Sequence, residues 1–328
     1  GGTGGIGKLI ALFLAEKYQA KLILVGRKLI TSEINVFLEL IESLGGEATY
    51  YSCDISRTQD LKEVINEVEK RYQKINGIIH SAGLVKDSML TKKEPEDMSK
   101  VFEPKVQGLL NLDQLTKHLH IDWLVLCSSV SGVFGNIGQA DYAVANCFMD
   151  NFALSRNIAQ SEGKRNGTTI SINWPYWKEG GMRISSQQSD RLERIIGMKP
   201  LETSEGIGVF LDALKMNIPH TIVFKGDKLI YLENVISRFQ SFNLEKQFDN
   251  ELYKHASVVE PDSNKRLLKD LKIRLNSILA AALKVELDDI DYDTVLEEYG
   301  LDSILMTQIL DEMEFELGFT IEPGALLE

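Results

Sequence analysis

Short apolar runs alternate with amphipathic stretches along the first 224 residues of the chain. Buried β-strands are predicted at five of these runs, namely Lys21–Val25, Ala48–Cys53, Gly77–His80, Trp123–Cys127 and Thr168–Trp174. Between them, apolar positions at helical spacing predict helices such as Lys8–Tyr18, Leu61–Tyr72 and Val106–His118. Strand–helix alternation of this kind is typical of a parallel sheet covered on both faces. We therefore predict an α/β fold with a Rossmann-like, doubly wound parallel sheet.

The pattern changes after Thr221–Phe224, the last apolar run of this series. A polar stretch with Pro261 follows and predicts a linker, and helical patterns then occupy Leu267–Leu283 and Ile304–Leu317. We predict an α/β domain at 1–239, a linker at 240–263 and a small all-α unit at 264–328. We expect both ends to be cut, because the glycine-rich start lacks a preceding strand and the helical unit stops early for a stable bundle.

Charge is concentrated at one end of the chain. The net charge is −12, and Asp262–Glu328 holds sixteen acidic and six basic residues. Such a segment repels nucleic acid and anionic membranes, so we predict neither as a partner. It either presents an acidic surface to basic partner proteins or only aids solubility.

Other features of composition exclude several classes of protein. The chain has no run of eighteen apolar residues and no signal peptide at its start, which argues against a membrane span and against secretion. Its three cysteines, Cys53, Cys127 and Cys147, lie far apart and predict free thiols rather than a disulfide or metal framework. We expect a cytoplasmic protein without a metal site.

A glycine-rich motif opens the chain and predicts a nucleotide site. It fits G-x-G-x-x-G, starts a helix, and is followed by a strand at the expected distance; its residues are Gly2, Thr3, Gly4, Gly5, Ile6 and Gly7. Glycines at these positions let the backbone approach a pyrophosphate at the helix N-terminus. A glycine-rich turn without a ligand is the alternative interpretation.

The residues that end the next strands indicate which nucleotide binds. An NAD site carries an acid about 20 residues after the glycine loop, but Arg27 and Lys28 stand there instead. Because a guanidinium suits a 2′-phosphate, we predict NADPH, the alternative being that both cations are merely solvated. We expect Asp54 and Ile55 to contact the adenine, and Ser81, Ala82 and Gly83 to let the cofactor lie close.

A hydroxyl and a phenol are placed to converge on one carbonyl. Ser129 ends a predicted strand, and Tyr142 begins a helix thirteen residues later. Ketone reduction needs a proton on oxygen, and a phenol, with a reference pKa of about 10, exchanges one easily only if a nearby ammonium favours phenolate. The residue four after Tyr142 is Asn146 rather than lysine, and Lys105 on a nearby predicted helix is the substitute.

Several segments carry a resemblance to a known family. GGTGGIG, HSAG, EPKVQG, CSSVSGVFGNIGQADYAVAN and INWPYW resemble the ketoreductase domains of modular polyketide synthases, which are short-chain dehydrogenases/reductases. In that family lysine and asparagine trade places, as Lys105 and Asn146 do here. The resemblance implies that Tyr142 is the proton donor and Ser129 binds the substrate oxygen. It also implies that Lys105 tunes the phenol and holds the nicotinamide ribose, while Asn146 completes the polar network.

The acidic unit near the end of the chain is similar to an acyl carrier protein. Gly300-Leu301-Asp302-Ser303 precedes an amphipathic helix, and an Asp–Ser pair is by itself also a common helix start. Downstream of a ketoreductase, the motif implies that Ser303 carries a covalent 4′-phosphopantetheine arm. The partners implied are a carrier-bound polyketide intermediate, other synthase domains and a phosphopantetheinyl transferase.

The same resemblance implies a stereochemical outcome. Asp87 matches the second acid of a Leu-Asp-Asp motif that marks reductases giving D-configured 3-hydroxyacyl products, although Lys86 replaces the first acid. The opposite class carries a tryptophan where this chain has Phe134. We therefore expect a D-3-hydroxyacyl thioester, unless Asp87 is only a solvated loop acid.

Two other functions remain open at this stage. One is a free-standing short-chain reductase of a small soluble ketone, against which Asn146 and the motif at Ser303 argue. The other is an inactive scaffold domain, against which the four intact residues Lys105, Ser129, Tyr142 and Asn146 argue.

Overall fold

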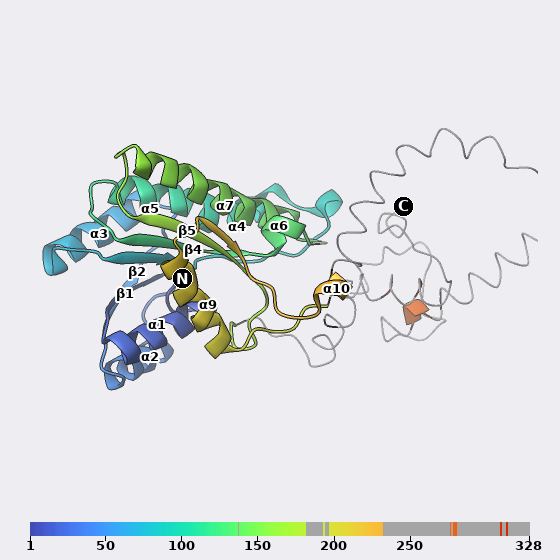
Figure 1. Ribbon diagram of the computed structural model, residues 1–328, viewed down its shortest axis with the longest axis horizontal. Coiled ribbons are helices and arrows are strands. Elements are labelled where there is room, and N and C mark those ends of the chain that lie inside the picture. The colour runs from blue at the N-terminus through green and yellow to red at the C-terminus, as the bar shows by residue number, and fades with distance from the viewer. Residues whose placement is uncertain are drawn as a thin grey trace, which may run out of the picture. The chain divides into compact units, whose positions relative to one another are not determined.

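The computed structural model describes residues 1–136, 138–181, 193, 197–231, 276, 278–280, 309 and 313. The chain divides into two compact units, one of Gly1–Lys86 with Lys93–Arg238 and the other of Asp87–Lys92 with Phe239–Glu328. The first unit contains the sheet and its covering helices (Figure 1). In the described part of the chain no helix is long and apolar enough to cross a membrane.

The described strands pair in parallel and form two sheets, one of two strands and one of four. β1 pairs with β2, and the second group pairs in the order β3-β4-β5-β6. The strand bounds are β1 Lys21–Gly26, β2 Glu47–Ser52, β3 Gly77–His80, β4 Trp123–Ser129, β5 Thr168–Trp174 and β6 His220–Ile222. Parallel pairing brings the carboxyl ends of the strands to one edge, where sites of doubly wound folds lie.

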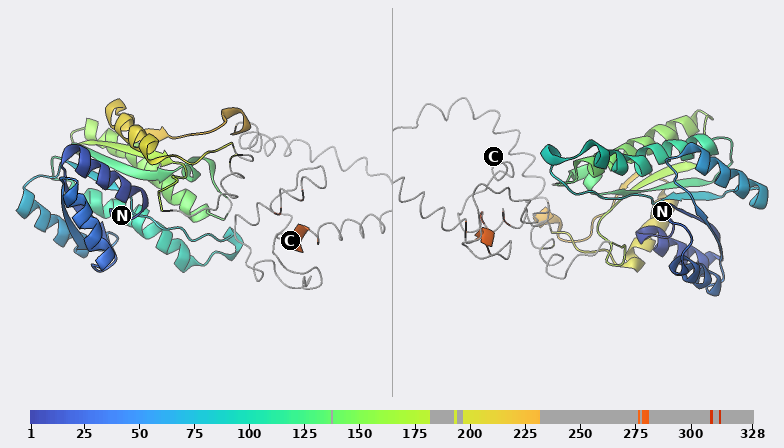
Figure 2. Two further views of the ribbon diagram at one scale, coloured as in Figure 1. Left: turned by 90° about the horizontal axis from the view of Figure 1, so that it is seen from below. Right: turned by 180° about the vertical axis from the view of Figure 1, so that it is seen from behind.

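Helices cover both faces of the sheet. α1, α2 and α9 lie on one face, whereas α3, α5 and α7 lie on the other (Figures 1 and 2). The helical bounds are α1 Gly5–Tyr18, α2 Ser32–Ser43, α3 Thr58–Tyr72, η1 Leu90–Lys92, α4 Pro95–Phe102, η2 Glu103–Gln107, α5 Gly108–Thr116, α6 Ser131–Phe134, α7 Ala140–Ser161, α9 Thr203–Met216 and α10 Lys228–Tyr231.

The central strand β4 shows why the sheet needs both layers. Successive side chains of a strand point to opposite faces. Leu124 and Leu126 pack among α5 and α7 residues, whereas Val125 joins the core formed with α1 and α9. Each of these three side chains is at most 1% exposed. Polar residues on either face would leave unpaired groups in a dry interior, so the run is apolar throughout.

The predicted α/β, doubly wound parallel fold is confirmed. Each of the five predicted strands is present, with ends shifted by up to two residues. The predicted helix Val106–His118 is partly wrong, because the segment at its start is a π-turn, η2, that α5 follows. Of the predicted helices in the last part of the chain, residues 276, 278–280, 309 and 313 are described and are helical.

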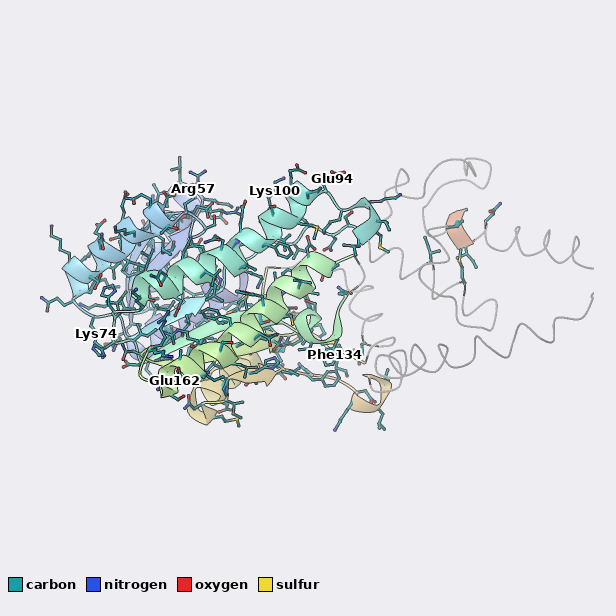
Figure 3. All side chains as sticks on the ribbon, turned by 90° about the horizontal axis from the view of Figure 1, so that it is seen from above. Arg57, Lys74, Glu94, Lys100, Phe134 and Glu162 are labelled. Carbon is teal, nitrogen blue, oxygen red and sulfur yellow. The ribbon has the colours of Figure 1, made fainter. Side chains whose placement is uncertain are left out.

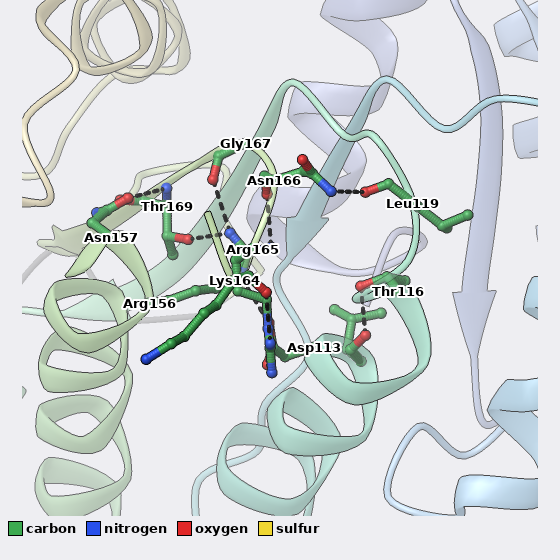
Figure 4. Close-up of polar contacts among 11 residues, drawn as sticks. Asp113, Thr116, Leu119, Arg156, Asn157, Lys164, Arg165, Asn166, Gly167 and Thr169 are labelled. Carbon is green, nitrogen blue, oxygen red and sulfur yellow. Dashed lines mark hydrogen bonds and ion pairs between the residues drawn. The ribbon is translucent and has the colours of Figure 1, made fainter. Parts of the chain in front are cut away.

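A buried ionic network closes the edge of the sheet formed by the amino ends of the strands. The Arg156 guanidinium of α7 donates to Asp113 Oδ1 of α5 at 2.7 Å and to the Thr169 hydroxyl at 2.9 Å. It also donates to two backbone carbonyls of the turn before β5, those of Asn166 and Gly167 (Figure 4). Arg165 makes a second contact with Asp113 at 2.9 Å. The network ties α5, α7 and β5 together.

Candidate active site

Lys105 is a buried cation at the carboxyl ends of β3 and β4. Its side chain lies on η2, where Pro104 has no N–H to donate, and Gly108 N–H bonds to Glu103 O across a wide turn. Lys105 is 3% exposed, and its Nζ donates to Cys127 O at 3.0 Å. The ammonium lies 5.3 Å from the centroid of the Tyr142 ring. Among the described residues no carboxylate pairs with it, so its charge is available to a phenolate or a ligand.

Tyr142 and Asn146 lie one turn apart on α7. Asn146 Nδ2 donates to Tyr142 O at 2.7 Å, and Ser128 Oγ donates to Asn146 O at 3.3 Å. Asn146 is fully buried, and its Oδ1 has no hydrogen-bond partner in the described structure. A buried acceptor without a donor costs free energy, so this oxygen indicates a place for a water or a ligand donor.

Ser129 ends β4, and its hydroxyl is oriented by a residue that the sequence analysis missed. Ser131 donates to Ser129 Oγ from its backbone N–H at 3.2 Å and from its own hydroxyl at 2.9 Å. The Ser129 oxygen is therefore used as an acceptor, and its hydrogen is left to donate. A Cβ on Gly132 would lie 2.9 Å from Asn146 Cβ, so this turn packs directly on α7.

The glycine loop lies against the end of β3 and forms a cradle. A Cβ on Gly7 would lie 2.4 Å from Ser81 Oγ, and one on Gly83 would lie 2.8 Å from Lys105 Cε. The N-cap of α1 is Gly4, which has no side chain to bond the first free N–H groups of the helix. These residues fit a dinucleotide, since the start of α1 leaves backbone N–H donors without side-chain partners at the edge of the sheet where Lys105 and Asn146 lie.

The cationic pair at the end of β1 is exposed, and its backbone is held by Tyr50. Arg27 and Lys28 extend into solvent. The Tyr50 hydroxyl lies 2.6 Å from Lys28 O, to which it donates, and 3.1 Å from Gly26 O. The sequence analysis missed Tyr50, because nothing in β2 alone shows that its hydroxyl crosses to the neighbouring strand.

The predicted adenine contacts follow β2. Asp54 Oδ1 accepts from Ser56 N–H at 3.0 Å and from Ser56 Oγ at 2.7 Å. Asn111 of α5 donates to Ile55 O at 3.0 Å and to Ser56 O at 2.8 Å. The turn is thus fixed at the same edge of the sheet as the glycine loop.

Titratable groups beside Lys105 are held neutral. Burial, followed by the Lys105 ammonium, lowers the pKa of His80 to about 3. Burial raises the pKa of the Cys127 thiol to about 11. Near neutral pH these side chains add no charge to the site. No group of three or more His, Cys, Asp or Glu that could hold a metal occurs among the described residues.

Two predicted site residues fall outside this cluster. Ser303 lies outside the described residues. Asp87 lies between β3 and η1, in the segment that belongs to the second unit, so its relation to Tyr142 stays a prediction.

Comparisons with known proteins point in one direction. A family model described as "KR domain" matches residues 1–179, and one described as "Phosphopantetheine attachment site" matches residues 274–328. Polyketide synthase PksN of Bacillus subtilis (strain 168) is 36% identical over 329 residues, which cover 100% of this chain and 6% of that protein. Polyketide synthase ThaG of Burkholderia thailandensis is 29% identical and matches 95% of this chain and 5% of its own length. The chain therefore spans a small part of these relatives.

Solved structures give the same picture. A ketoreductase domain from the bacillaene assembly line has a TM-score of 0.69 and 36% identity, covering 71% of this chain and 56% of that one. An N-terminal ketoreductase from the macrolactin assembly line has a TM-score of 0.65 and 37% identity, covering 71% and 45%.

Proposed function

The chain belongs to the ketoreductase family of polyketide synthases, and we propose that it reduces the 3-keto group of a carrier-bound acyl thioester with NADPH. The observation that carries this proposal is the buried Lys105 ammonium, 5.3 Å from the Tyr142 ring and without a carboxylate among the described residues. A cation in this place favours the phenolate that proton donation leaves behind. The intact set of polar residues around it argues for a working site rather than a scaffold.

Each polar side chain has a distinct task in this proposal. The Tyr142 hydroxyl donates a proton to the substrate oxygen, and the Ser129 hydroxyl donates a hydrogen bond to the same oxygen. Lys105 Nζ stabilises the phenolate, while Asn146 holds the first turn of α7 through Tyr142 O. Bound NADPH supplies the hydride for the substrate carbon. The glycine loop would hold its pyrophosphate, Arg27 and Lys28 its 2′-phosphate, Asp54 its adenine, and Lys105 its ribose.

Stereochemistry follows from the side on which the substrate enters. We infer that Asp87 marks this chain as a reductase that gives the D-3-hydroxy product. Because a bound nicotinamide is fixed, the side from which the arm enters decides which ketone face is reduced. Chiral chromatography of the product from a 3-ketoacyl thioester tests this, and a predominantly L product contradicts it.

The last part of the chain is proposed to be the carrier. The proposed domain limits are 1–239, 240–263 and 264–328, and Ser303 is one of the residues 274–328 that match the phosphopantetheine family model. We propose that a phosphopantetheinyl transferase modifies Ser303, and that the whole protein works in the cytoplasm beside other synthase domains. With coenzyme A and a transferase, the unmodified protein should gain the mass of the arm and Ser303→Ala should not. Equal mass in both would contradict the carrier assignment.

The reductase proposal is tested with a short 3-ketoacyl thioester and NADPH. Tyr142→Phe removes the proton donor and keeps the ring, so kcat should fall by about 10²–10⁴-fold. NADPH binding, followed by its fluorescence, should persist in that variant. Near-normal turnover by Tyr142→Phe would show that the phenol is structural.

A further inference from the structure

A buried ion pair lies directly beside the proposed proton donor. Lys93 Nζ is 3.0 Å from Asp141 Oδ2, and the two side chains are 2% and 1% exposed. Lys93 stands between η1 and α4, whereas Asp141 is in the first turn of α7 and precedes Tyr142. The pair therefore joins segments separated by 48 residues in the sequence.

Both members of the pair make a second contact that reaches the site. Asp141 Oδ1 accepts from the Tyr142 backbone N–H at 2.9 Å. Lys93 Nζ also donates to the backbone carbonyl of Lys86, in the segment that follows β3. Figure 3 labels Glu94, the residue after Lys93, and Phe134, which lies shortly before α7 in the sequence. The two labelled residues lie at the same end of the first unit.

The ion pair affects the site more than it affects the free energy of unfolding. A buried ion pair contributes little compared with apolar packing, but removing one partner leaves an uncompensated charge. Asp141 Oδ2 has no hydrogen-bond partner elsewhere in the described residues, so its charge depends on Lys93. An unpaired anion at Asp141 would lie one residue from the phenol and would oppose phenolate formation.

We propose that Lys93 is a positioning residue for the reduction, which neutralises Asp141 and fixes the first turn of α7 so that the Tyr142 hydroxyl faces the substrate oxygen. Its bond to the Lys86 carbonyl fixes the backbone after β3 at the same time. This role rests on the proposed function, since it matters only if Tyr142 is the proton donor.

Several other charged or titratable groups lie on the elements that pack against α7. Lys105 on η2 contacts the Tyr142 ring directly, and Asp97 on α4 pairs with Lys86 and Lys100. Asp150 lies two turns along α7 and faces His220 of β6 at 3.6 Å. The thiol of Cys127 on β4 stays protonated, because burial raises its pKa to about 11. Among the described contacts, the Lys93–Asp141 pair is therefore the charged group that bonds to the backbone of Tyr142. Lys105 contacts the ring of Tyr142 instead.

The kinetic test compares Lys93→Met, Asp141→Asn, the double variant, and Lys100→Met as a control at an exposed ion pair. Lys93→Met should lower kcat by roughly 100-fold, the effect of misplacing a reacting group by about 1 Å. The KM for NADPH should stay unchanged. The double variant removes both charges and should recover most of the lost kcat, because a neutral buried pair is tolerated. Melting temperatures separate loss of fold from loss of position.

The pH profile of the reverse reaction gives a readout that a merely structural role would not move. Oxidation of the 3-hydroxyacyl thioester with NADP⁺ needs the phenolate, so its rate rises with pH. Lys93→Met leaves an anion near Tyr142 and should move this rise to higher pH, whereas Asp141→Asn leaves a cation and should move it to lower pH. Displacement in opposite directions supports the proposal, and displacement in the same direction overturns it.

The outcomes also separate this proposal from the proposed function. An unmodified protein that reduces no 3-ketoacyl thioester overturns the function and with it the role of Lys93. An active protein in which Lys93→Met behaves like Lys100→Met, or in which the double variant is no better than Lys93→Met, overturns the role of Lys93 alone.

Discussion

Two buried cations, Lys105 and Arg156, lie at opposite ends of the helical layer formed by η2, α5 and α7. Arg156 is 4% exposed and has a carboxylate, a hydroxyl and two carbonyls as partners. Lys105 is 3% exposed, but the contacts described for it are one carbonyl, one sulfur atom and one aromatic ring. A buried cation whose donors all have partners makes its network rigid. A buried cation with few partners can still bind a ligand or stabilise a reacting group. The comparison separates the end that stabilises the fold from the end that is proposed to carry out the reduction.

The largest effect should come from removing Lys105, the buried cation that has no carboxylate partner among the described residues. Lys105→Met should lower kcat by at least about 100-fold, because the phenolate loses its stabilising charge. The free energy of unfolding should not decrease, since a buried ammonium without a carboxylate is costly to desolvate. Steady-state kinetics and urea unfolding measure the two quantities. Lys62→Met, at an exposed position of α3, is the control. A variant that loses stability and keeps its kcat would reverse the distinction between the two ends.

Removing Arg156 should have the opposite effects on stability and on kcat. Arg156→Met leaves the Asn166 and Gly167 carbonyls without their buried donor and leaves Asp113 paired with Arg165 alone, so it should lower the free energy of unfolding by about 3 kcal/mol. The kcat per folded molecule should not change. Lys164→Met, at a 68% exposed side chain, is the matched control in urea unfolding. A loss of kcat without a loss of stability would show that the far end also serves the site.

His80 gives a pH-dependent version of the comparison, because its imidazole stays neutral beside Lys105. Its folded pKa of about 3 lies below the usual value of about 6.5 in an unfolded chain. Between these values the unfolded chain binds a proton that the folded chain does not, so stability is lost as pH falls below 6.5. From pH 7 to pH 5 the loss should be about 2 kcal/mol. His80→Asn should reduce this loss, measured by urea unfolding at pH 5 and 7, and His118→Asn should not. An unchanged slope in His80→Asn would show that the imidazole is not the group that titrates.

Arg27 extends the comparison to an exposed cation, which should affect cofactor choice alone. Arg27→Ala should weaken NADPH binding by roughly 1.5–3 kcal/mol, about one to two decades, and leave NADH unaffected. Fluorescence titration with both cofactors measures this, with the exposed Lys17→Ala as control. Equal use of NADH and NADPH by the unmodified protein would contradict the assignment.

The smallest effect should come from Tyr50, which holds the backbone beside that cation. Tyr50→Phe removes the hydrogen bonds to Gly26 O and Lys28 O, and should lower the preference for NADPH by roughly two- to tenfold. The ratio of kcat/KM for the two cofactors is the measurement. A preference unchanged from that of the unmodified protein would show that Arg27 is placed without this hydroxyl.

The sequence predicted most of the fold because its strands are apolar on both faces and local periodicity shows this. It also identified Lys105, Ser129, Tyr142 and Asn146, which the structure brings to one edge of the sheet. It could not show Ser131, Tyr50 or the Lys93–Asp141 pair, because each acts through a contact that only the folded chain creates. The π-turn at η2 was missed for a local reason, since a pattern of apolar residues does not reveal one extra residue in a turn.

The π-turn η2 determines what the deletion of one residue near Lys105 would do. In an α-helix each residue advances the chain by about 100° around the axis. Because Gly108 N–H bonds to Glu103 O, five residues of η2 fill one turn in place of four, so deleting one residue between Glu103 and Gln107 would restore an ordinary turn and keep the segments on either side in phase. Leu109 would keep its place against β4, whereas the side chains inside the turn, Lys105 among them, would be displaced. Substitutions near Lys105 therefore change the site one contact at a time, whereas an in-frame deletion of a single codon would move Lys105 away from the Tyr142 ring and spare the core packing.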